Sequence, residues 1–274
     1  MSHKEIIAEH EIVIGNVIEK LCEHEDRFDL IIADPPFGID FDKNCHEYGS
    51  EGYILYEDDF SDDEYGAFSY QWISKCYDAL KTNGSMYIVS GWTNIGEILN
   101  AVKKTGFIVK NHLIWYFEWG VYAKRKYVTS HYHILFLVKH GKNYNFTPYW
   151  VNKNSKRKGN PYEKDVWYWP KYNRGNDPDH IKGHPCQLPI VLMKKMINIS
   201  SDPGDWIGDV FCGSGGTLLA AREMGRNCVS FEINPEYVKI IEEKAKLDKK
   251  IMFYPENSRE IEKKIQKEID SFIL

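Results

Sequence analysis

The fold of this 274-residue chain is decided by the stretch Asp205-Trp206-Ile207-Gly208-Asp209-Val210-Phe211-Cys212-Gly213-Ser214-Gly215-Gly216. Its first half is strand-like, and its second half is a glycine-rich turn, which lets the backbone approach a ligand closely at the carboxyl end of a strand. A helical pattern follows over 216–224, and a second strand-like run, 227–231, ends in Glu232. An acidic residue about twenty positions beyond such a turn suits hydrogen bonding to ribose hydroxyls. The stretch therefore predicts an α/β sheet that binds a nucleoside-type ligand.

Two common nucleotide-binding loops are disfavoured by the residues of this turn. A P-loop has Gly-Lys followed by Ser or Thr, and no such run follows here. A dinucleotide loop has a third glycine, which Gly213-Ser214-Gly215-Gly216-Thr217-Leu218 lacks. S-adenosylmethionine is then the best candidate ligand. We expect the loop and the strand end to hold it through Asp209, Phe211, Gly213, Ser214, Gly215 and Glu232.

A second motif, Asp34-Pro35-Pro36-Phe37, directly follows the apolar run Leu30–Ala33. Proline fixes φ and has no N–H, so the proline carbonyls and the Asp34 carboxylate form a rigid set of acceptors. The Phe37 ring offers a stacking surface for a flat ligand. This combination suits the exocyclic amino group of a planar base. It predicts Asp34, Pro35, Pro36 and Phe37 as the catalytic residues.

Strand-like and helical runs alternate along the chain, which predicts an α/β fold with a mainly parallel sheet. The expected strands are 11–14, 30–33, 85–90, 107–117, 131–139, 206–210 and 227–232. The expected helices are 63–80, 93–104, 188–199, 216–224 and 235–247. The two long aromatic runs, 107–117 and 131–139, predict an antiparallel hairpin at the edge of the sheet.

The net charge of −5 hides an uneven distribution. Residues 1–102 carry 6 Lys/Arg and 21 Asp/Glu, residues 103–174 carry 15 and 3, and residues 175–274 carry 14 and 16. A basic middle block is typical of a surface that faces nucleic-acid phosphates. Within it, segment 141–183 predicts a DNA-recognition insertion with little regular structure. The expected phosphate contacts are Lys153, Lys156, Arg157 and Lys158.

Two further features narrow the class of protein. The sequence has no leading apolar segment with a basic flank and no run of about 18 apolar residues, so we expect a cytoplasmic protein without a membrane span. The six cysteines form no Cys-x-x-Cys pair, which indicates reduced thiols rather than disulfides or a metal site.

In the order of its motifs, the chain resembles the β-group of DNA amino-methyltransferases over nearly its whole length. That group has a DPPY or DPPF motif first, then a target-recognition region, a His-Pro segment and an FxGSG loop. Here these are Asp34–Phe37, the basic insertion, His184–Pro189 and Phe211–Gly215. The resemblance implies a Rossmann-like methyltransferase sheet, circularly ordered with the catalytic half first. Its parts would be a catalytic half at 1–140, a target-recognition insertion at 141–183 and a cofactor-binding half at 184–274.

Three positions depart from the pattern of that group. Gly15-Asn16 stands where the group often has Gly-Asp in contact with the cofactor adenine, and Leu188 stands where Lys is common. The usual Asp-Pro-Phe is Asp209-Val210-Phe211. Asn keeps a side-chain acceptor, so the resemblance adds Asn16, His184 and Gln187 to the expected cofactor contacts. Because the catalytic motif is intact, we expect an active enzyme.

The implied reaction is methylation of N6 of adenine in DNA, on a base that is flipped out of the duplex. N4-cytosine methylation uses the same chemistry, although that target more often goes with Ser at the first motif position. Methylation of RNA or of a protein glutamine, and a catalytically silent DNA-binding subunit, are further alternatives. The resemblance also implies a homodimer, and a cognate restriction endonuclease is a further expected partner.

Overall fold

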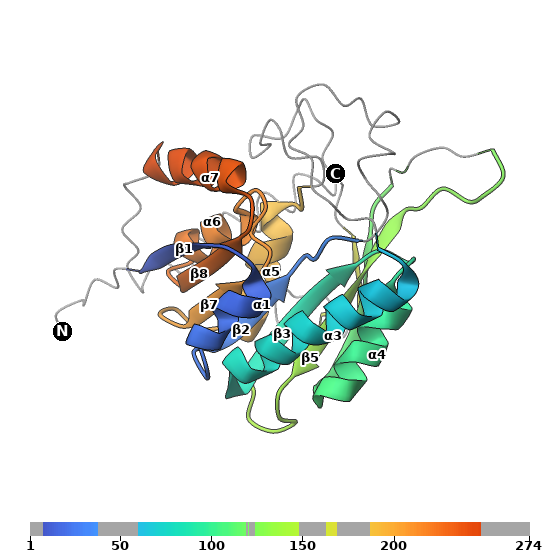
Figure 1. Cartoon of the computed structure of the whole chain (residues 1–274), viewed down its shortest axis with the longest axis horizontal. Helices are drawn as coiled ribbons and strands as arrows, with labels where there is room; N and C mark the ends of the chain where they lie inside the picture. The colour runs from blue at the N-terminus through green and yellow to red at the C-terminus, as the bar shows by residue number, and fades with distance from the viewer. Residues whose placement is uncertain are drawn as a thin grey trace, which may run out of the picture.

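The structure, a computed structural model, describes residues 8–37, 60–118, 120, 124–147, 163–168 and 187–247, the last range with side chains up to residue 242. Within these ranges the strands form one eight-stranded sheet in the order β1-β8-β7-β2-β3-β5-β4-β6 (Figure 1). The strands are β1 (His10–Ile14), β2 (Phe28–Ala33), β3 (Leu80–Ser90), β4 (Ile108–Tyr116), β5 (His131–Val138), β6 (Val166–Tyr168), β7 (Trp206–Asp209) and β8 (Asn227–Glu232). The helices are α1 (Val17–Lys20), α3 (Asp62–Ala79), α4 (Ile95–Thr105), α5 (Ile190–Ser200), α6 (Gly216–Glu223) and α7 (Pro235–Leu247).

The parallel part of the sheet contains β1, β8, β7, β2 and β3. From β2 the chain continues to β3 on one side, whereas β7 and β8 occupy the other side. The sheet therefore has a switch point between β2 and β7. In open α/β sheets, ligands bind outside the carboxyl ends of the strands at such a point. Both sequence motifs follow these two strands.

The expected hairpin of β4 and β5 is antiparallel, but it does not form the edge of the sheet, because β6 lies beyond it. β5 pairs with β3 on one side and with β4 on the other, and β6 pairs in parallel with β4. The expectation of little regular structure in 141–183 is thus wrong for Val166–Tyr168, which closes this side of the sheet. Periodicity could not reveal a three-residue strand, because its pairing partner lies some fifty positions earlier in the chain.

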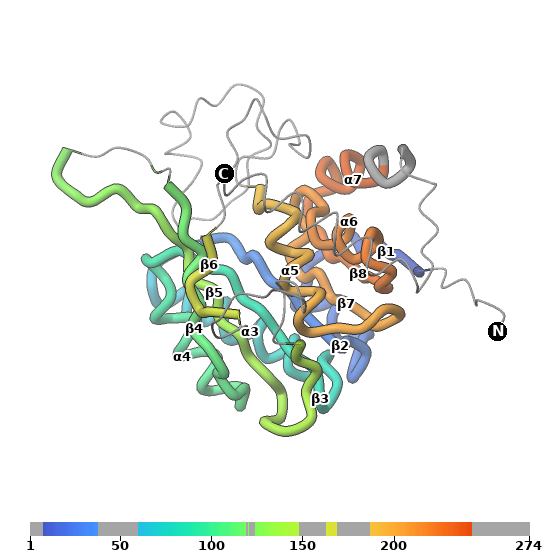
Figure 2. The backbone as a smooth tube through the Cα atoms, turned by 180° about the vertical axis from the view of Figure 1, so that it is seen from behind, coloured from blue at the N-terminus to red at the C-terminus, as the bar shows by residue number. Residues whose placement is uncertain are grey.

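Helices cover both faces of the sheet (Figures 1 and 2). On one face, α3 and α4 contribute Trp72, Ile73 and Ile98 to the core. On the other, α5 and α6 contribute Met196 and Leu218. None of the described helices is long and apolar enough to cross a membrane.

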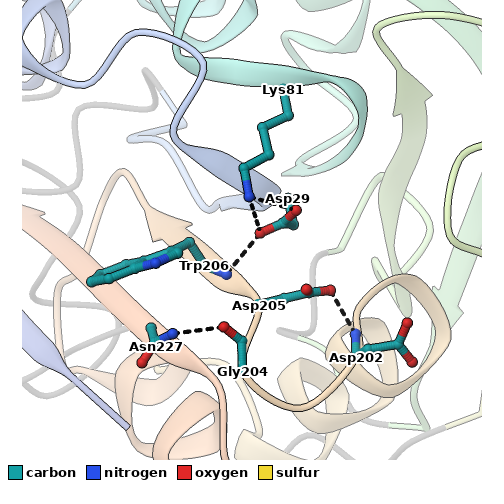
Figure 3. A network of polar contacts seen from close by, with 7 residues as sticks. All are labelled: Asp29, Lys81, Asp202, Gly204, Asp205, Trp206 and Asn227. Carbon is teal, nitrogen blue, oxygen red and sulfur yellow. Dashed lines mark hydrogen bonds and ion pairs between the residues drawn. The ribbon is translucent and has the colours of Figure 1, made fainter.

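A polar network ties the amino ends of the central strands together (Figure 3). Asp29, near the start of β2, accepts hydrogen bonds from Lys81 Nζ at 2.8 Å and from the backbone N–H of Trp206 at 2.9 Å. Asn227 Nδ2 donates to the carbonyl of Gly204 at 2.7 Å. The network joins β2, β3, β7 and β8 at the edge opposite Asp34–Phe37. It holds the strands in register without touching the candidate site.

Candidate active site

The tetrapeptide Asp34–Phe37, the candidate catalytic motif, lies where β2 ends, and β2 has a parallel neighbour on each side. Ala33 pairs with Ile88 of β3, and Ile32 pairs with Asp209 of β7. Asp34 therefore lies just past the end of β2, two residues after Ile32, which pairs with Asp209. Pro35 is buried, while Asp34, Pro36 and Phe37 are half-buried. The motif is thus fixed in the sheet edge beside the glycine loop.

Two side chains from elsewhere in the chain hold the backbone of the motif. The hydroxyl of Tyr65, on α3, donates a hydrogen bond to the Pro36 carbonyl at 2.9 Å. Asn94, in the β3–α4 connection, donates its amide Nδ2 to the Phe37 carbonyl at 2.5 Å. Tyr65 and Asn94 are 1% and 7% exposed. Both donors are buried, so their hydrogen bonds restrain the successive carbonyls of Pro36 and Phe37.

The Phe37 ring is held in an aromatic wall. A Cβ at Gly91 would lie 3.3 Å from the Phe37 ring, so the chain after β3 passes close to it. Tyr132 of β5 meets Phe37 edge to face at 5.4 Å between ring centroids. Tyr132 in turn contacts Trp115 and Phe117 at 5.5 and 5.3 Å. These contacts fix the position of the half-buried Phe37 ring at the end of β2.

The glycine loop after β7 needs glycine for steric reasons. Gly215 has φ +80, and a Cβ there would lie 3.0 Å from Ile241 of α7. Gly213 also has a positive φ of 50. The Phe211 ring packs edge to face on Trp72 of α3, with 5.2 Å between the ring centroids. The loop thus presents backbone atoms at the sheet edge while Phe211 anchors it on α3.

Glu232, at the end of β8, is tied to the loop through both carboxylate oxygens. Oε2 accepts the backbone N–H of Gly213 and Oε1 accepts that of Asn234, both at 2.8 Å. Burial raises the pKa of Glu232, and the backbone N–H bonds oppose this rise. Each oxygen can accept a second hydrogen bond, so the ribose role expected for Glu232 fits its position.

Asp209 is buried below the loop. Its Oδ2 accepts a hydrogen bond from Ser230 at 3.3 Å, and the Cys212 thiol also donates to the carboxylate. Burial raises the pKa of Asp209 to about 7, against the effect of these two bonds. Asp209 is 3% exposed, and the neighbouring Ser214 is 6% exposed. The geometry gives Asp209 a role in fixing the loop from below.

The remaining expected cofactor residues are distributed as follows. Asn16 caps α1, with its Oδ1 accepting the backbone N–H of Ile18 at 3.0 Å. Its neighbour Gly15 donates its N–H to the Glu232 carbonyl at 2.9 Å, which brings this turn to the end of β8. Gln187 is half-buried just before α5. His184 and the DNA-contact candidates Lys153, Lys156, Arg157 and Lys158 lie outside the described residues.

The structure adds residues that sequence reasoning missed: Tyr65, Asn94 and Tyr132. Tyr65 lies on the apolar stripe of a helix, and Tyr132 alternates with His131 and His133 on a strand. Each was indistinguishable from a core or edge residue in the sequence. Their contacts with the motif span 29 or more positions along the chain, and local patterns carry no signal for such pairs.

The residues of this sheet edge fit S-adenosylmethionine. A turn without bulky side chains, Gly213 to Gly215, leaves backbone close to the edge, and a buried carboxylate, Glu232, stands one strand away. This is the donor and acceptor set that a nucleoside needs. The fold and the site define an α/β cofactor-binding protein with an acceptor motif one strand from its cofactor loop.

A family model described as DNA methylase, of the N6 and N4 methyltransferases, matches residues 28–243. The chain belongs to this family and is a DNA methyltransferase. Type II methyltransferase M.HpaI of Haemophilus parainfluenzae is 30% identical over 243 residues, covering 85% of this chain and 73% of the relative. DNA adenine methyltransferase YhdJ of Escherichia coli strain K12 is 32% identical over 248 residues, covering 84% and 80%.

Solved structures share the fold. The PvuII DNA methyltransferase, which is cytosine-N4-specific, superposes with a TM-score of 0.69 at 18% identity, covering 96% of this chain and 95% of that one. The complex of M1.HpyAVI with S-adenosylmethionine superposes with a TM-score of 0.60 at 24% identity, covering 86% and 99%. At these identities the likeness establishes the mixed α/β methyltransferase fold.

Proposed function

We propose that this DNA methyltransferase transfers a methyl group from S-adenosylmethionine to N6 of adenine in DNA. The observation that carries the proposal is the position of Asp34. It follows β2 directly, at the switch point, and the cofactor loop follows the adjacent strand β7. The backbone N–H of Val210 also reaches the Ile32 carbonyl at 3.4 Å, so the two strand ends run side by side toward the site.

The target amino group is a poor nucleophile, because its lone pair is delocalised into the ring. The Asp34 carboxylate and the Pro35 carbonyl accept its two N–H hydrogens, which favours a tetrahedral nitrogen. Bound S-adenosylmethionine supplies an electrophilic sulfonium methyl group. The nitrogen lone pair would form the new N–C bond in line as the S–C bond breaks, with the electron pair of that bond staying on the sulfur of the thioether product. The nitrogen would then lose one proton to water. Catalysis rests on positioning and electrostatics without a covalent enzyme intermediate.

Support for adenine comes from two sources. The chain has Asp, not Ser, at the first position of the catalytic motif. One relative that covers most of this chain at 32% identity is named a DNA adenine methyltransferase. N4 of cytosine is the alternative target, because its amino group offers the same two N–H hydrogens to Asp34 and Pro35.

The site residues and the division of the chain are part of the same proposal. Asp34 to Phe37 form the catalytic motif, and Asn16, His184, Gln187, Asp209, Phe211, Gly213, Ser214, Gly215 and Glu232 form the cofactor site. Residues 1–140 are the catalytic half, 141–183 the target-recognition insertion and 184–274 the cofactor half of one circularly ordered Rossmann-like domain. Lys153, Lys156, Arg157 and Lys158 contact phosphates. We further propose that the protein is a homodimer and that it has a cognate restriction endonuclease. It would act in the cytoplasm, where the DNA that it modifies is found.

The test is methyl transfer from labelled S-adenosylmethionine to unmethylated bacterial DNA, followed by digestion to nucleosides. Label in N6-methyldeoxyadenosine supports the proposal, whereas label in N4-methyldeoxycytidine alone refutes the adenine assignment. Asp34→Ala should abolish transfer while cofactor binding, measured by calorimetry, is retained. Full turnover in Asp34→Ala would refute the mechanism.

A further inference from the structure

The connection between β4 and β5, residues 117–130, is called the arm below; residues 117, 118, 120 and 124–130 of it are described. It leaves the sheet beside the candidate active site. At its base, the backbone N–H of Phe117 donates to the Ser130 carbonyl at 2.9 Å, which extends the β4–β5 ladder. The Phe117 ring contacts Tyr132 at 5.3 Å, and Tyr132 contacts Phe37 of the catalytic motif. One aromatic residue, Tyr132, therefore separates the base of the arm from the ring proposed to stack on the target base.

The tip of the arm has the composition of a nucleic-acid contact. Lys124, Arg125 and Lys126 are consecutive and exposed, and Tyr127, next to them, is 98% exposed. None of the ion pairs between described residues uses these three cations. In the described part of the chain, the charge of these three side chains is not neutralised by an ion pair, and the Tyr127 ring lies in solvent. Both are therefore available for contact with another molecule.

The legs of the arm are close together where they are described. A Cβ at Gly120 would lie 2.1 Å from the Thr129 carbonyl oxygen and 2.5 Å from Val128 Cγ1. Only glycine allows this approach, so one leg lies directly against the other. Figure 1 shows the described part of the arm extending well away from the sheet. Because the two legs touch near the base, the tip is held at a more constrained distance from the site than in a connection whose legs are separate.

We propose that this arm binds duplex DNA beside the target base: Lys124, Arg125 and Lys126 contact backbone phosphates, and Tyr127 packs on a sugar or base. The proposal rests on the DNA methyltransferase function and adds a second contact region to the lysines and arginine of 153–158. An extended chain spans about 3.3 Å per residue, so the six residues from Ser130 out to Lys124 reach about 20 Å. At about 3.4 Å per base pair, the tip contacts phosphates within about six base pairs of the flipped base.

The occupant is DNA rather than an acidic protein for two reasons. The whole block 103–174 carries 15 Lys/Arg against 3 Asp/Glu, so the tip lies within the most basic part of the chain. The arm also leaves the same sheet edge on which Asp34 lies, because β5 begins there and β4 ends there. A duplex whose base enters the site must pass this edge.

The first test measures binding to a duplex by fluorescence anisotropy over a series of salt concentrations. The variant Lys124→Ala/Arg125→Ala/Lys126→Ala should reduce the slope of log K against log salt by about 2.7, since each phosphate contact contributes about 0.9. The matched control is Lys103→Ala/Lys104→Ala, two exposed lysines in the last turn of α4, near the opposite sheet edge. Its slope should change by less than the triple variant's. Equal slopes for wild type and triple variant would overturn the proposal.

The second test concerns Tyr127 and the reach of the arm. Tyr127→Ala should weaken binding about 5- to 150-fold, the range for losing one aromatic stacking contact, and Tyr127→Phe should restore most of it. Neutral methylphosphonate linkages within about six base pairs of the target should weaken wild-type binding but not binding of the triple variant. Equal sensitivity in both proteins would exclude phosphate contacts by the tip.

The outcomes separate this proposal from its alternatives and from the proposed function. A triple variant that keeps its DNA affinity but shifts from dimer to monomer in light scattering would make the arm a subunit contact and refute DNA binding. If wild-type protein binds DNA with the predicted salt slope but methylates neither base, the arm stands and the proposed reaction fails. Equal melting temperatures of wild type and variants exclude misfolding as the cause.

Discussion

The hydrogen bond from Tyr65 to the catalytic motif leads to a sharp prediction for the variant Tyr65→Phe. The substitution removes one hydroxyl from a side chain that is 1% exposed and leaves the Pro36 carbonyl without this donor, 2.9 Å away in the native structure. A lost buried hydrogen bond of this kind costs about 1–3 kcal/mol. Because Pro35 is adjacent, part of that free energy should appear as misplacement of its carbonyl relative to the target nitrogen.

A loss of about 1.4 kcal/mol in the transition state corresponds to a tenfold slower reaction. We therefore expect Tyr65→Phe to reduce single-turnover methyl transfer about tenfold at saturating cofactor. Cofactor affinity should remain nearly unchanged, because the bond touches β2 and α3 and not the glycine loop. Asn94→Ala, which frees the Phe37 carbonyl, should have a similar effect, and the double variant should lose more than either single variant.

The assay is rapid-quench transfer of a labelled methyl group, combined with urea unfolding to measure stability. Tyr70→Phe is the control, because it makes the same chemical change on the same helix at a side chain that is 42% exposed. If Tyr65→Phe loses stability but transfers methyl groups as fast as Tyr70→Phe, the bond is structural only. The positioning role would then be refuted.

Three further predictions concern the loop and the amino edge of the sheet. Gly215→Ala should weaken cofactor binding at least tenfold in calorimetry, because its φ of +80 disfavours a side chain by about 1–2 kcal/mol and its Cβ would meet Ile241 at 3.0 Å. Burial raises the pKa of the Asp209 carboxyl from 3.8 to about 7. Folding therefore favours the protonated carboxyl, and its contribution to stability is fully present below about pH 4 and is lost as pH rises through 7. Asp209→Asn does not ionise, so it should avoid that loss, on the order of 4 kcal/mol at 1.36 kcal/mol per pKa unit. The free energy of unfolding in urea, variant minus wild type, should therefore be more favourable at pH 8 than at pH 5. The same difference at both pH values would contradict the raised pKa. Asp29→Ala should lower the free energy of unfolding by about 1–3 kcal/mol, because the Trp206 N–H loses its acceptor, while turnover per folded molecule stays the same.

Most of the fold could be predicted from the sequence because its signals are local. Seven of the eight described strands were expected, and the long helices were placed within two residues of their observed ends. Asp62–Ala79 begins at a capping box formed by Ser61 and Glu64, a signal contained in four consecutive residues. Strand β6 was missed, since three residues in a polar segment have no period of their own.

The sequence by itself determined the two motifs, their order and the kind of ligand each suits, because proline rigidity, glycine freedom and charge are properties of the residues themselves. Only the tertiary structure decided how the motifs are held. Tyr65 and Asn94 hydrogen-bond to the backbone of the Asp34–Phe37 motif, and Glu232 accepts a hydrogen bond from the glycine loop. Strand β5 lies inside the sheet instead of at its edge. These arrangements join residues 19 to 57 positions apart, and such contacts depend on how whole elements pack. The physical reason is that a hydrogen bond or ring contact has no local sequence period, whereas a helix or a strand does.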